Sequence, residues 1–365
     1  MSMPTAEEPM IDERYIGLRG VVEYLCSDEC LPRLPGTPGG LAARQYVEAA
    51  FDRLGLEPAG EEGYLQHIPA IGGANVIGQR RGRSERTIIV GAHFDACAID
   101  GGVNPGASDN AASVAVMLEV AKAITAGPLL ERSVVFAGFD AEEPPYFQTH
   151  RMGSRHFVNK EAVPLSRIDL MICLDMIGHA IGDGAESEIA DTVLVLGAEK
   201  CPQVSEVLAH VPAVPGVFPR RLDVDLIDQL SDYAGFQDAG VPFLFYNNGR
   251  NEHYHATSDT PKSLDFPKMA ALVEHLTGVV TVAANAPIEP FVYEPDGQGH
   301  GMTLETIRAL LPTLPPSARL AQQAPQLLAT LADKQSATGL NERDWQIVRR
   351  IFLAIDDGLL DKRPW

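Results

Sequence analysis

The sequence predicts an α/β fold: a three-layer sandwich in which a mostly parallel, mixed central sheet is flanked by helices and followed by a C-terminal helical extension. Short apolar runs without alternation recur along the chain, which is typical of strands buried on both faces. Helical apolar patterns lie between these runs, and strands that alternate with helices indicate a largely parallel sheet. Beyond about residue 287 the helical patterns continue without strand signals, which sets the extension apart.

The expected elements can be placed in chain order. Residues 40–54 have apolar side chains at near-helical spacing and stop at Gly55, as an amphipathic helix with a glycine C-terminus does. The i, i+3, i+4, i+7 series from Val114 to Ile124 predicts a second helix, and Met269 to Thr281 predicts a third. The expected buried strands are Thr87 to Val90, Val134 to Phe139, Leu170 to Leu174, Val193 to Leu196 and Phe243 to Tyr246.

The last part of the chain predicts a helical module. We expect a main domain over residues 1–287, a connector with Pro and Gly over 288–300, and a helical extension over 301–365. The final helix has Asn341 as its predicted N-cap and Asp344 at the third position. It carries one apolar stripe, formed by Trp345, Val348, Phe352, Ile355 and Leu359. A stripe of this size must be buried, either against the main domain or in a homo-oligomer through the C-terminal helices.

Composition and charge exclude several classes of partner. The 365 residues include 29 Lys and Arg against 49 Asp and Glu, for a formal charge of −20. Nucleic acid and anionic membrane surfaces would therefore be repelled. The longest apolar runs fall far short of the roughly 20 residues that span a bilayer. The N-terminal residues lack the basic and apolar regions of a signal peptide, so a cytoplasmic location is expected.

The cysteine content indicates mostly free thiols. Five cysteines are an odd number in a long chain, which does not suggest a disulfide framework. Cys26 and Cys30 are four residues apart and could meet within one helical turn. Whether this pair is bridged stays open.

Polar side chains follow the predicted strands at the points where the strands end. Because functional groups in open α/β folds lie at the carboxyl ends of strands, we expect two histidines and four carboxylates from separate segments to converge there. A further aspartate, Asp109, directly precedes the helix that starts near Ala111, where it could also be an N-cap. The residues that follow the strands are His93 and Asp95, Glu142 and Glu143, Asp175, and His255.

Such a cluster of carboxylates indicates a metal centre. Converging carboxylates repel one another and would need raised pKa values unless a cation lies among them. Neutral imidazole together with carboxylate oxygen is a ligand set that suits zinc. Because several carboxylates can be shared, two ions a few ångströms apart are plausible.

These residues lie in motifs that resemble the zinc aminopeptidases, family 28 of the metallopeptidases, typified by bacterial leucyl aminopeptidases; the glutaminyl cyclases are relatives. The motifs stand in the family's order and approximate spacing, and the resemblance covers roughly residues 15–287. It makes the main domain a zinc-peptidase catalytic domain and leaves the extension outside. The motifs are His93-Phe94-Asp95, Pro105 to Asn110, Phe139 to Glu143, Met152-Gly153-Ser154, Leu174 to Gly178, Ser231-Asp232-Tyr233, and Tyr254-His255 with Asp259-Thr260.

The resemblance implies a role for each site residue. Asp109 would bridge two zinc ions, with His93 and Asp175 holding one ion and Glu143 and His255 holding the other. Glu142 matches the general base, which takes a proton from the bridging water. Asp95 matches an aspartate that accepts the N–H of His93 and fixes its tautomer; the alternative is an exposed loop acid. The family often has a cis peptide bond after its bridging aspartate, which corresponds to Asp109-Asn110 here.

Other residues compete for these assignments. His253 lies two residues before His255, but the spacing to Asp259 and Thr260 favours His255. Three further histidines are expected to be solvent-exposed or capping: His150, His156 and His179. Cys97 and Cys173 could bind soft metals, but each is interpreted as a small buried apolar residue.

The chain departs from the family pattern in two places. An inserted segment, Pro144 to Met152, follows the two glutamates and should overhang the pocket, where its aromatic residues would shape substrate entry. Tyr233 stands where a histidine commonly follows Ser-Asp. Neither departure affects a predicted ligand.

The leading functional hypothesis is a co-catalytic dizinc aminopeptidase that acts on peptides with a free N-terminus. The alternative is a glutaminyl-peptide cyclotransferase with a single zinc on the same fold. The cyclases that this pattern resembles have indole rings in the pocket, whereas both tryptophans here, Trp345 and Trp365, lie in the extension. A carboxypeptidase and a non-catalytic binding module are less favoured, the latter because all five ligands and Glu142 are present.

Overall fold

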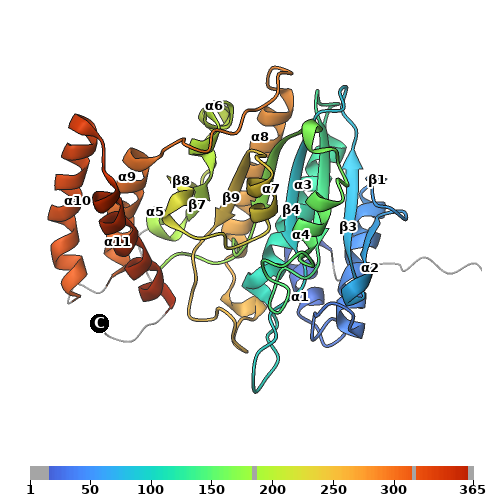
Figure 1. Ribbon diagram of the computed structural model, residues 1–365. Coiled ribbons are helices and arrows are strands. Elements are labelled where there is room, and N and C mark those ends of the chain that lie inside the picture. The colour runs from blue at the N-terminus through green and yellow to red at the C-terminus, as the bar shows by residue number, and fades with distance from the viewer. Residues whose placement is uncertain (1–15, 183–186, 315–317, 361–365) are drawn as a thin grey trace, which may run out of the picture.

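The structure, a computed structural model, describes residues 16–182, 187–314 and 318–360 and is built on one mixed sheet of nine strands (Figure 1). The predicted strands are all present, some of them longer than expected, together with four others. Their bounds are β1 Glu57–Pro58, β2 Leu65–Ile68, β3 Gly73–Arg80, β4 Thr87–His93, β5 Ser133–Phe139, β6 Ile168–Leu174, β7 Thr192–Leu196, β8 Phe218–Leu222 and β9 Phe243–Asn247.

The helices lie on both sides of this sheet and beyond one of its ends (Figure 1). The helix predicted to stop at Gly55 is α2, and the other two predicted helices are α3 and α8. The helices of the described residues are α1 Gly17–Leu25, α2 Pro38–Arg53, α3 Ala112–Ala126, α4 Gly153–Asn159, α5 Ser187–Ala190, α6 Pro202–His210, α7 Tyr233–Asp238, α8 Phe266–Asn285, α9 His300–Leu310, α10 Arg319–Thr338 and α11 Glu342–Leu360.

The centre of the sheet is parallel, and an antiparallel pair of strands adjoins it on each side. The strand order is β1-β3-β5-β4-β6-β9-β7-β8, and β2 pairs with β3 outside this path. Strands β5, β4, β6 and β9 run parallel, and β3 and β7 are antiparallel to their neighbours β5 and β9. The carboxyl ends of the four central strands therefore meet at one edge, where ligands bind in open α/β sheets.

Both faces of the central strands are buried, as expected from their apolar runs. Successive side chains of a strand point to opposite faces, so Val90 packs in the cluster that contains α1, α2, α3 and α8. Its neighbour Ile89 packs in a second cluster with α4, α7 and the C-terminal helices. The predicted three-layer α/β sandwich is thereby confirmed.

The C-terminal helices α9, α10 and α11 pack beside β7 and β8, at the end of the sheet farthest from α2 (Figure 1). Residues of the stripe on α11, Trp345, Val348 and Phe352 among them, are buried in the same cluster as Leu196 of β7. The side chain of Leu359 lies outside the described residues. Burial within the chain accounts for the stripe, and assembly through these helices stays a prediction.

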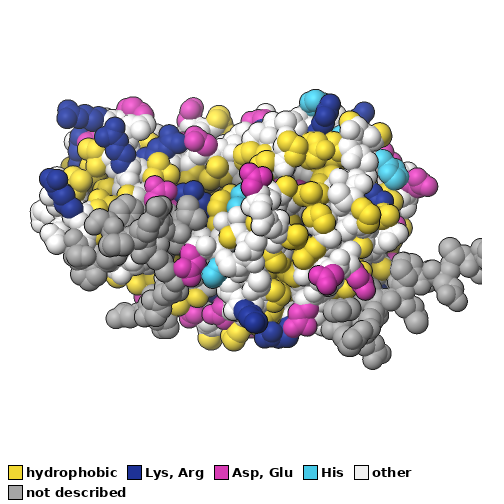
Figure 2. All heavy atoms as spheres, turned by 90° about the horizontal axis from the view of Figure 1, so that it is seen from below, with side chains coloured by type: hydrophobic (Ala, Val, Ile, Leu, Met, Phe, Trp, Pro, Cys, Tyr) yellow, Lys and Arg dark blue, Asp and Glu magenta, His cyan; other side chains and the backbone are white. Residues whose placement is uncertain are grey.

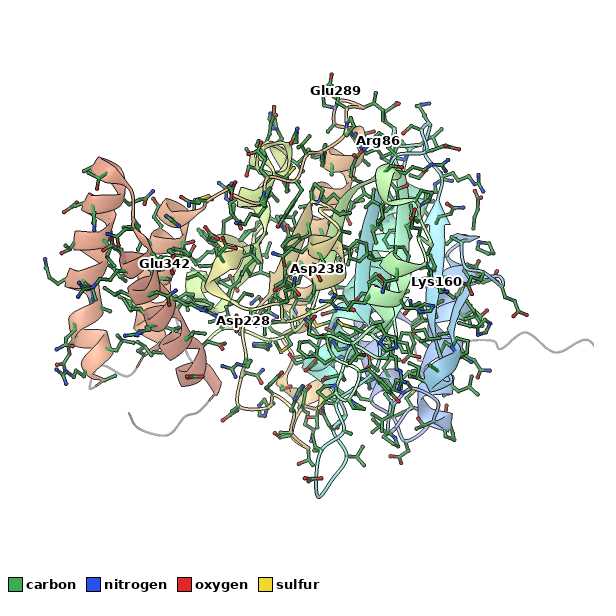
Figure 3. All side chains as sticks on the ribbon, viewed as in Figure 1. Arg86, Lys160, Asp228, Asp238, Glu289 and Glu342 are labelled. Atoms are coloured by element: carbon green, nitrogen blue, oxygen red, sulfur yellow. The ribbon has the colours of Figure 1, made fainter. Side chains whose placement is uncertain are left out.

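Hydrogen bonds at its start and near its middle fix the position of α11. The Asn341 side chain accepts a hydrogen bond from the Asp344 backbone N at 3.0 Å, and Asp344 accepts one from Asn341 N at 3.0 Å. This reciprocal capping satisfies two N–H groups at the start of the helix. Further along, Arg349 donates to Asp228 at 2.9 Å, and Asp228 lies between the sheet and the C-terminal helices (Figure 3).

The surface agrees with the acidic composition. Figure 2, which views the molecule from below Figure 1, shows Asp and Glu side chains scattered among hydrophobic ones. Among the described residues, no helix combines the length with the apolar character that crossing a bilayer requires. Cys26 and Cys30 are both free thiols, and Cys26 donates to the Pro105 carbonyl at 3.3 Å.

Candidate metal centre and its cavity

The central strands deliver the predicted site residues to one edge of the sheet. His93 is the last residue of β4, and Asp175 follows directly after the end of β6. Glu142 and Glu143 come three and four residues after β5 ends at Phe139. Because these strands are parallel neighbours, side chains that are far apart in the sequence become adjacent in space.

Asp109 reaches the same edge from the other direction. It lies in an irregular turn, residues 107–111, that leads into α3, and its backbone angles are non-helical (φ −119°, ψ 84°). The peptide bond between Asp109 and Asn110 is cis, as the family resemblance implied. Asp109 is therefore not an N-cap of α3, since its side chain faces the site instead of the helix.

The first group of candidate ligands consists of His93, Asp109 and Asp175, whose ligand atoms all lie within 4.8 Å of one another. The His93 Nε2 atom is 3.3 Å from Asp109 Oδ1 and 3.6 Å from Asp175 Oδ1. Glu142 Oε2 lies 3.8 Å from the same nitrogen. All four residues are buried.

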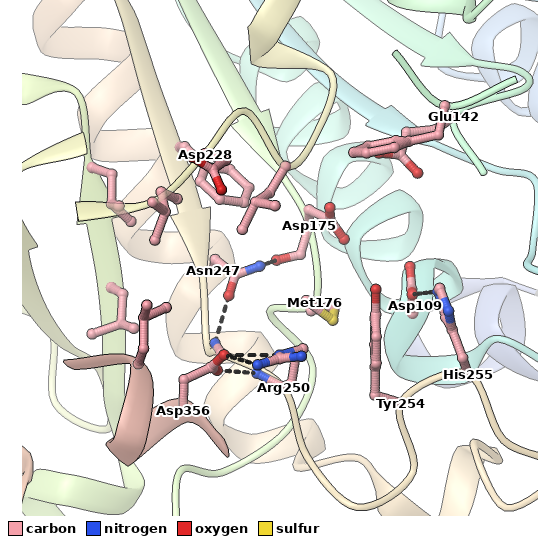
Figure 4. Close-up of a pocket in the computed structure, with 18 of the residues that line it drawn as sticks. Asp109, Glu142, Asp175, Met176, Asp228, Asn247, Arg250, Tyr254, His255 and Asp356 are labelled. Atoms are coloured by element: carbon pink, nitrogen blue, oxygen red, sulfur yellow. Dashed lines mark hydrogen bonds and ion pairs between the residues drawn. The ribbon is translucent and has the colours of Figure 1, made fainter. Parts of the chain in front are cut away.

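The second group is on the opposite side of Asp109. The His255 Nε2 atom is 3.2 Å from Asp109 Oδ2 (Figure 4). The same nitrogen is 3.2 Å from Glu143 Oε1. Asp109 thus directs one carboxylate oxygen towards His93 and the other towards His255. This arrangement is the one that a carboxylate shared between two cations requires.

A cation fits this cluster on the evidence of its unpaired atoms. His93 Nε2 and Asp175 Oδ1 are buried without a hydrogen-bond partner, although buried polar atoms are normally paired. The two atoms face the same space, 3.6 Å apart. Imidazole nitrogen and carboxylate oxygen are ligands for zinc and similar divalent ions, so the donor set fits such an ion.

The electrostatics also favour a positive charge at this position. Burial, followed by the neighbouring carboxylates Glu143 and Asp175, raises the pKa of Glu142 well above its usual range. Burial and the charge of Asp109 raise the pKa of Glu143 to about 7. Burial opposes ionisation of Asp109 too, but hydrogen bonds to His255 and His93 lower its pKa. A bound cation would neutralise this repulsion.

Asp95 is buried, 1% exposed, and is not an exposed loop acid. Its carboxylate accepts hydrogen bonds from the backbone N atoms of Glu142 at 3.1 Å and Glu143 at 3.0 Å. Its Oδ1 atom also lies 3.4 Å from His93 Nδ1. One carboxylate therefore holds the backbone of both glutamates and orients the imidazole, which is a positioning role.

Two residues outside the predicted set position the loops that carry Asp109. The Asp259 carboxylate accepts hydrogen bonds from Ser108 N at 2.8 Å and Asp109 N at 3.1 Å. Arg33, which is fully buried, donates to the carbonyls of Leu25, Phe94, Pro105 and Gly106. Asp259 served only as a spacing marker in the sequence, and Arg33 has no local sequence signal.

The competing histidines lie apart from the two groups. His253 pairs with Ser258 Oγ at 3.0 Å, and His150 is exposed. His156 is half-buried on α4. The expectation that His179 is exposed or capping is wrong: it is buried, with Nδ1 2.9 Å from Ser108 Oγ. His179 therefore packs directly behind the turn that presents Asp109.

Cys97 was interpreted as a small buried apolar residue, and the structure gives it a more specific environment. Its Sγ atom, Glu143 and His255 form a second group whose ligand atoms lie within 4.8 Å of one another. Cys173, the other cysteine near the site in sequence, lies within β6 with Sγ 3.5 Å from Ser231 Oγ. The sequence placed both cysteines near the site but could not distinguish between them.

A cavity of about 340 Å³ opens beside the two groups. Its polar end is formed by Asp109, Glu142, Asp175 and His255 (Figure 4), together with Glu143. Its other end is apolar and includes side chains from β7, β9 and α11, namely Leu194, Leu196, Phe245, Phe352 and Leu353. Pro144 and Phe147 of the inserted segment line the cavity as well.

Aromatic residues shape the walls. The Tyr254 ring stacks on His255 with centroids 3.9 Å apart and lines the cavity. Tyr233 is buried, and its hydroxyl donates to the Asp228 carbonyl at 3.0 Å and accepts from Leu230 N at 3.2 Å. Tyr233 therefore holds the 228–230 segment, which supplies Asp228 and Leu230 to the cavity.

Comparison with known proteins gives a consistent result. The model of peptidase family M28 matches residues 75–280. An uncharacterized protein of Escherichia coli, YfbL, is 28% identical over 275 residues, 66% of this chain and 79% of its own. The probable lipoprotein aminopeptidase LpqL of Mycobacterium tuberculosis is 31% identical over 179 residues, 46% of this chain and 33% of its own.

Two further proteins complete the comparison. The glutaminyl-peptide cyclotransferase of Bos taurus is 29% identical over 179 residues, 40% of this chain and 49% of its own, so the match spans about half of that enzyme. The solved LapA aminopeptidase of Legionella pneumophila has the same fold, with a TM-score of 0.57 and 18% identity over 74% of this chain and 71% of its own. The family match covers more than half of the chain and includes every predicted ligand. The chain therefore belongs to peptidase family M28, a family of zinc-dependent metallopeptidases.

Proposed function

We propose that the protein is a co-catalytic dizinc aminopeptidase that removes the N-terminal residue from peptides with a free amino terminus. One observation carries the proposal: the two carboxylate oxygens of Asp109 face two separate groups of ligands, 3.3 Å from His93 Nε2 and 3.2 Å from His255 Nε2. His93 and Asp175 would complete one zinc position, and Glu143 and His255 the other.

The residues around these positions divide the chemistry between them. Zinc bound there would supply the positive charge that acidifies a water molecule and polarises the scissile carbonyl. Glu142, which is not needed as a ligand, would accept the proton of the attacking water and deliver it to the departing amine. Asp95 holds the backbone of Glu142 and thereby fixes the position of this base.

The cavity supports an exopeptidase with an apolar preference. Carboxylates dominate the end beside the ligands, which suits the ammonium group of a free N-terminus. The apolar end is lined by β7, β9 and α11, so we propose that it takes the side chain of a large apolar first residue, such as Leu or Phe. Burial of such a side chain would contribute about 1.5–3 kcal/mol.

A glutaminyl-peptide cyclotransferase is the second candidate, and the Bos taurus relative supports it. The two groups of candidate ligands favour the aminopeptidase, since they offer residues for two ions and a cyclotransferase needs a single zinc. No tryptophan lines the described cavity: Trp345 stacks on His300, with ring centroids 4.2 Å apart, among the C-terminal helices. Trp365 lies outside the described residues.

Glu142→Gln tests the proposal. We expect the variant to keep the zinc content of the parent protein while turnover of leucyl and phenylalanyl amides falls by at least about 100-fold, the lower limit for loss of a general base. Glu206→Gln, an exposed substitution on α6, is the matched control and should leave turnover unchanged. Turnover that survives in Glu142→Gln would refute the assigned base.

A substrate panel separates the candidate reactions. We expect release of the first residue from free-amine peptides and none from N-acetylated ones. Cyclisation of an N-terminal glutaminyl peptide without hydrolysis would instead establish the cyclotransferase. Release from the carboxyl end would establish a carboxypeptidase, and a chain that binds no zinc and hydrolyses nothing would be a binding module.

A further inference from the structure

We propose that the Cys97 thiolate is a protein ligand of the ion held by Glu143 and His255, so that the two metal positions differ in chemistry: one contains sulfur and the other only nitrogen and oxygen. This inference rests on the metal centre of the proposed function but not on peptide hydrolysis. None of the motifs that define the ligand set contains Cys97.

The placement of Cys97 carries the proposal. It lies four residues beyond His93 in the loop that follows β4 and is 9% exposed. Its Sγ atom lies within 4.8 Å of the ligand atoms of Glu143 and His255. The thiol donates a hydrogen bond to the Ala98 carbonyl at 3.5 Å; a thiol is a weak donor, and this bond would be given up when the thiol ionises to bind a metal.

The surrounding loop holds the thiol in position. The neighbouring Ala96 N donates to the Arg33 carbonyl at 3.0 Å, and Arg33 in turn donates to the carbonyls of Phe94 and Gly106. Asp95, two residues before Cys97, binds the backbone N of Glu143 at 3.0 Å. The segment that carries the thiol is therefore tied directly to the segment that carries its partner glutamate.

The remaining ligand atoms indicate that the site is built for cations. Asp109 belongs to both positions, with 3.2 Å from its Oδ2 to His255 Nε2. On its other side, His93 Nε2 and Asp175 Oδ1 are buried, unpaired and face Asp109. Cys97 thus joins a cluster in which independent unpaired atoms already point to a metal.

The thiolate would give the two positions different properties. His93, Asp109 and Asp175 supply three protein ligands, the number that leaves a coordination position open for water. Asp109, Glu143, His255 and Cys97 supply four, the number found in closed tetrahedral zinc sites. Thiolate also favours softer ions, so the Cys97 position should bind Zn²⁺, Co²⁺ or Cd²⁺ in preference to Mn²⁺ or Mg²⁺.

Cobalt substitution tests the ligand without relying on activity. The full chain is stripped of metal and titrated with Co²⁺ while its absorption spectrum is recorded. We expect a near-ultraviolet sulfur-to-cobalt charge-transfer band in the parent protein. The band should be absent in Cys97→Ser, and one of the two Co²⁺ ions should bind at least about tenfold more weakly, since loss of even an outer-shell partner has such an effect.

Cys173→Ala is the matched control, because Cys173 is a buried cysteine in β6 that belongs to neither ligand group. It should keep the band and both affinities. A band that persists in Cys97→Ser, or a parent protein that binds two Co²⁺ ions without a band, would overturn the proposal while leaving the dizinc peptidase intact. A parent protein that binds no Co²⁺ would overturn both.

A measurement on the unaltered chain covers the case in which Cys97→Ser does not fold. Brief treatment with iodoacetamide, followed by peptide mass analysis, reports which thiols are reactive. We expect zinc to protect Cys97 from alkylation and to leave the modification of the half-buried Cys26 unchanged. Equal alkylation of Cys97 with and without zinc would refute the thiolate bond.

Discussion

The two ends of the cavity are built in different ways. The metal end is formed by side chains that follow parallel strands, together with Asp109 from the turn before α3, all within the segment that matches the peptidase family, residues 75–280. The apolar end is completed by Phe352 and Leu353 of α11, which lies beyond that segment. In the proposed function the sheet would provide the chemistry, and α11 would help to select the substrate side chain that enters the cavity.

The two ends are also held by different forces. At the metal end, buried groups such as Asp95, Asp259 and Arg33 fix the backbone through short hydrogen bonds. At the α11 end, partly exposed ion pairs such as Arg250–Asp356 accompany apolar packing. Partly exposed contacts open more readily than buried ones, so the wall formed by α11 should be the more adaptable part of the cavity.

The largest effect should come from Asp109→Ala, which removes the carboxylate shared by both ligand groups. We expect zinc to be lost from both positions and turnover to fall by about 1,000-fold or more, the scale seen when a preorganised charge is removed. Metal analysis and amide hydrolysis measure the two effects. Asp100→Ala, an exposed carboxylate in the loop after β4, should change neither. Zinc retained at one position would show that the two ends of Asp109 act independently.

A smaller effect on activity but a large one on stability is expected for Arg33→Met. The substitution leaves four carbonyls without their donor, three of them on buried residues, and each loss at a buried carbonyl costs about 1–3 kcal/mol. Denaturant unfolding should show a loss of about 3 kcal/mol or more. Arg53→Met, at the exposed end of α2, is the control. A stability loss below about 1 kcal/mol would show that the loops at the metal end are held by other contacts.

Phe352→Ala tests the apolar end alone. The cavity should lose its selectivity for large first residues, with kcat/KM for phenylalanyl relative to alanyl amides falling about 10-fold, as for loss of apolar contact in a binding pocket. Zinc content should not change, because Phe352 touches no ligand. Val348→Ala, which is buried on the same helix but does not line the cavity, is the control. An unchanged ratio of kcat/KM for phenylalanyl and alanyl amides would show that α11 takes no part in substrate selection.

The central strands and most of the site residues could be predicted from the sequence. Apolar runs placed the five buried strands, and polar residues after those runs placed the six side chains that the structure brings together. These signals are local, because strand burial and strand ends leave a mark within a few residues. The roles of these residues as ligands and base stay predictions for the experiments above.

The remaining features depend on contacts that sequence patterns do not encode. Strand β3 contains Gly73, Asn75 and Gly78, which interrupt its apolar pattern, and Asn75 is buried because it bonds Gln66 and the Gly153 carbonyl. His179 was misread because residue type alone predicts average burial and not the neighbours. Cys97 is buried as expected, but its position beside Glu143 and His255 has no sequence signal. Helix α11 reaches the cavity through tertiary contacts such as Arg250–Asp356, which join residues more than 100 positions apart in the sequence.

The smallest expected effect concerns the ion pair that ties α11 to the loop after β9. Arg250 donates from its backbone N and its Nε to the two Asp356 oxygens, at 3.1 and 2.8 Å, and it lines the cavity beside Phe352. A double-mutant cycle of Arg250→Met and Asp356→Asn should give a coupling of about 1 kcal/mol, and KM for phenylalanyl amides should rise a few-fold while kcat is kept. Asp357→Asn, whose side chain is 63% exposed, should show a weaker coupling that salt removes. Equal coupling at both aspartates would mean that general charge attraction, and not the specific Arg250–Asp356 pair, holds α11. Apolar packing alone would then distinguish the adaptable α11 wall from the fixed metal end.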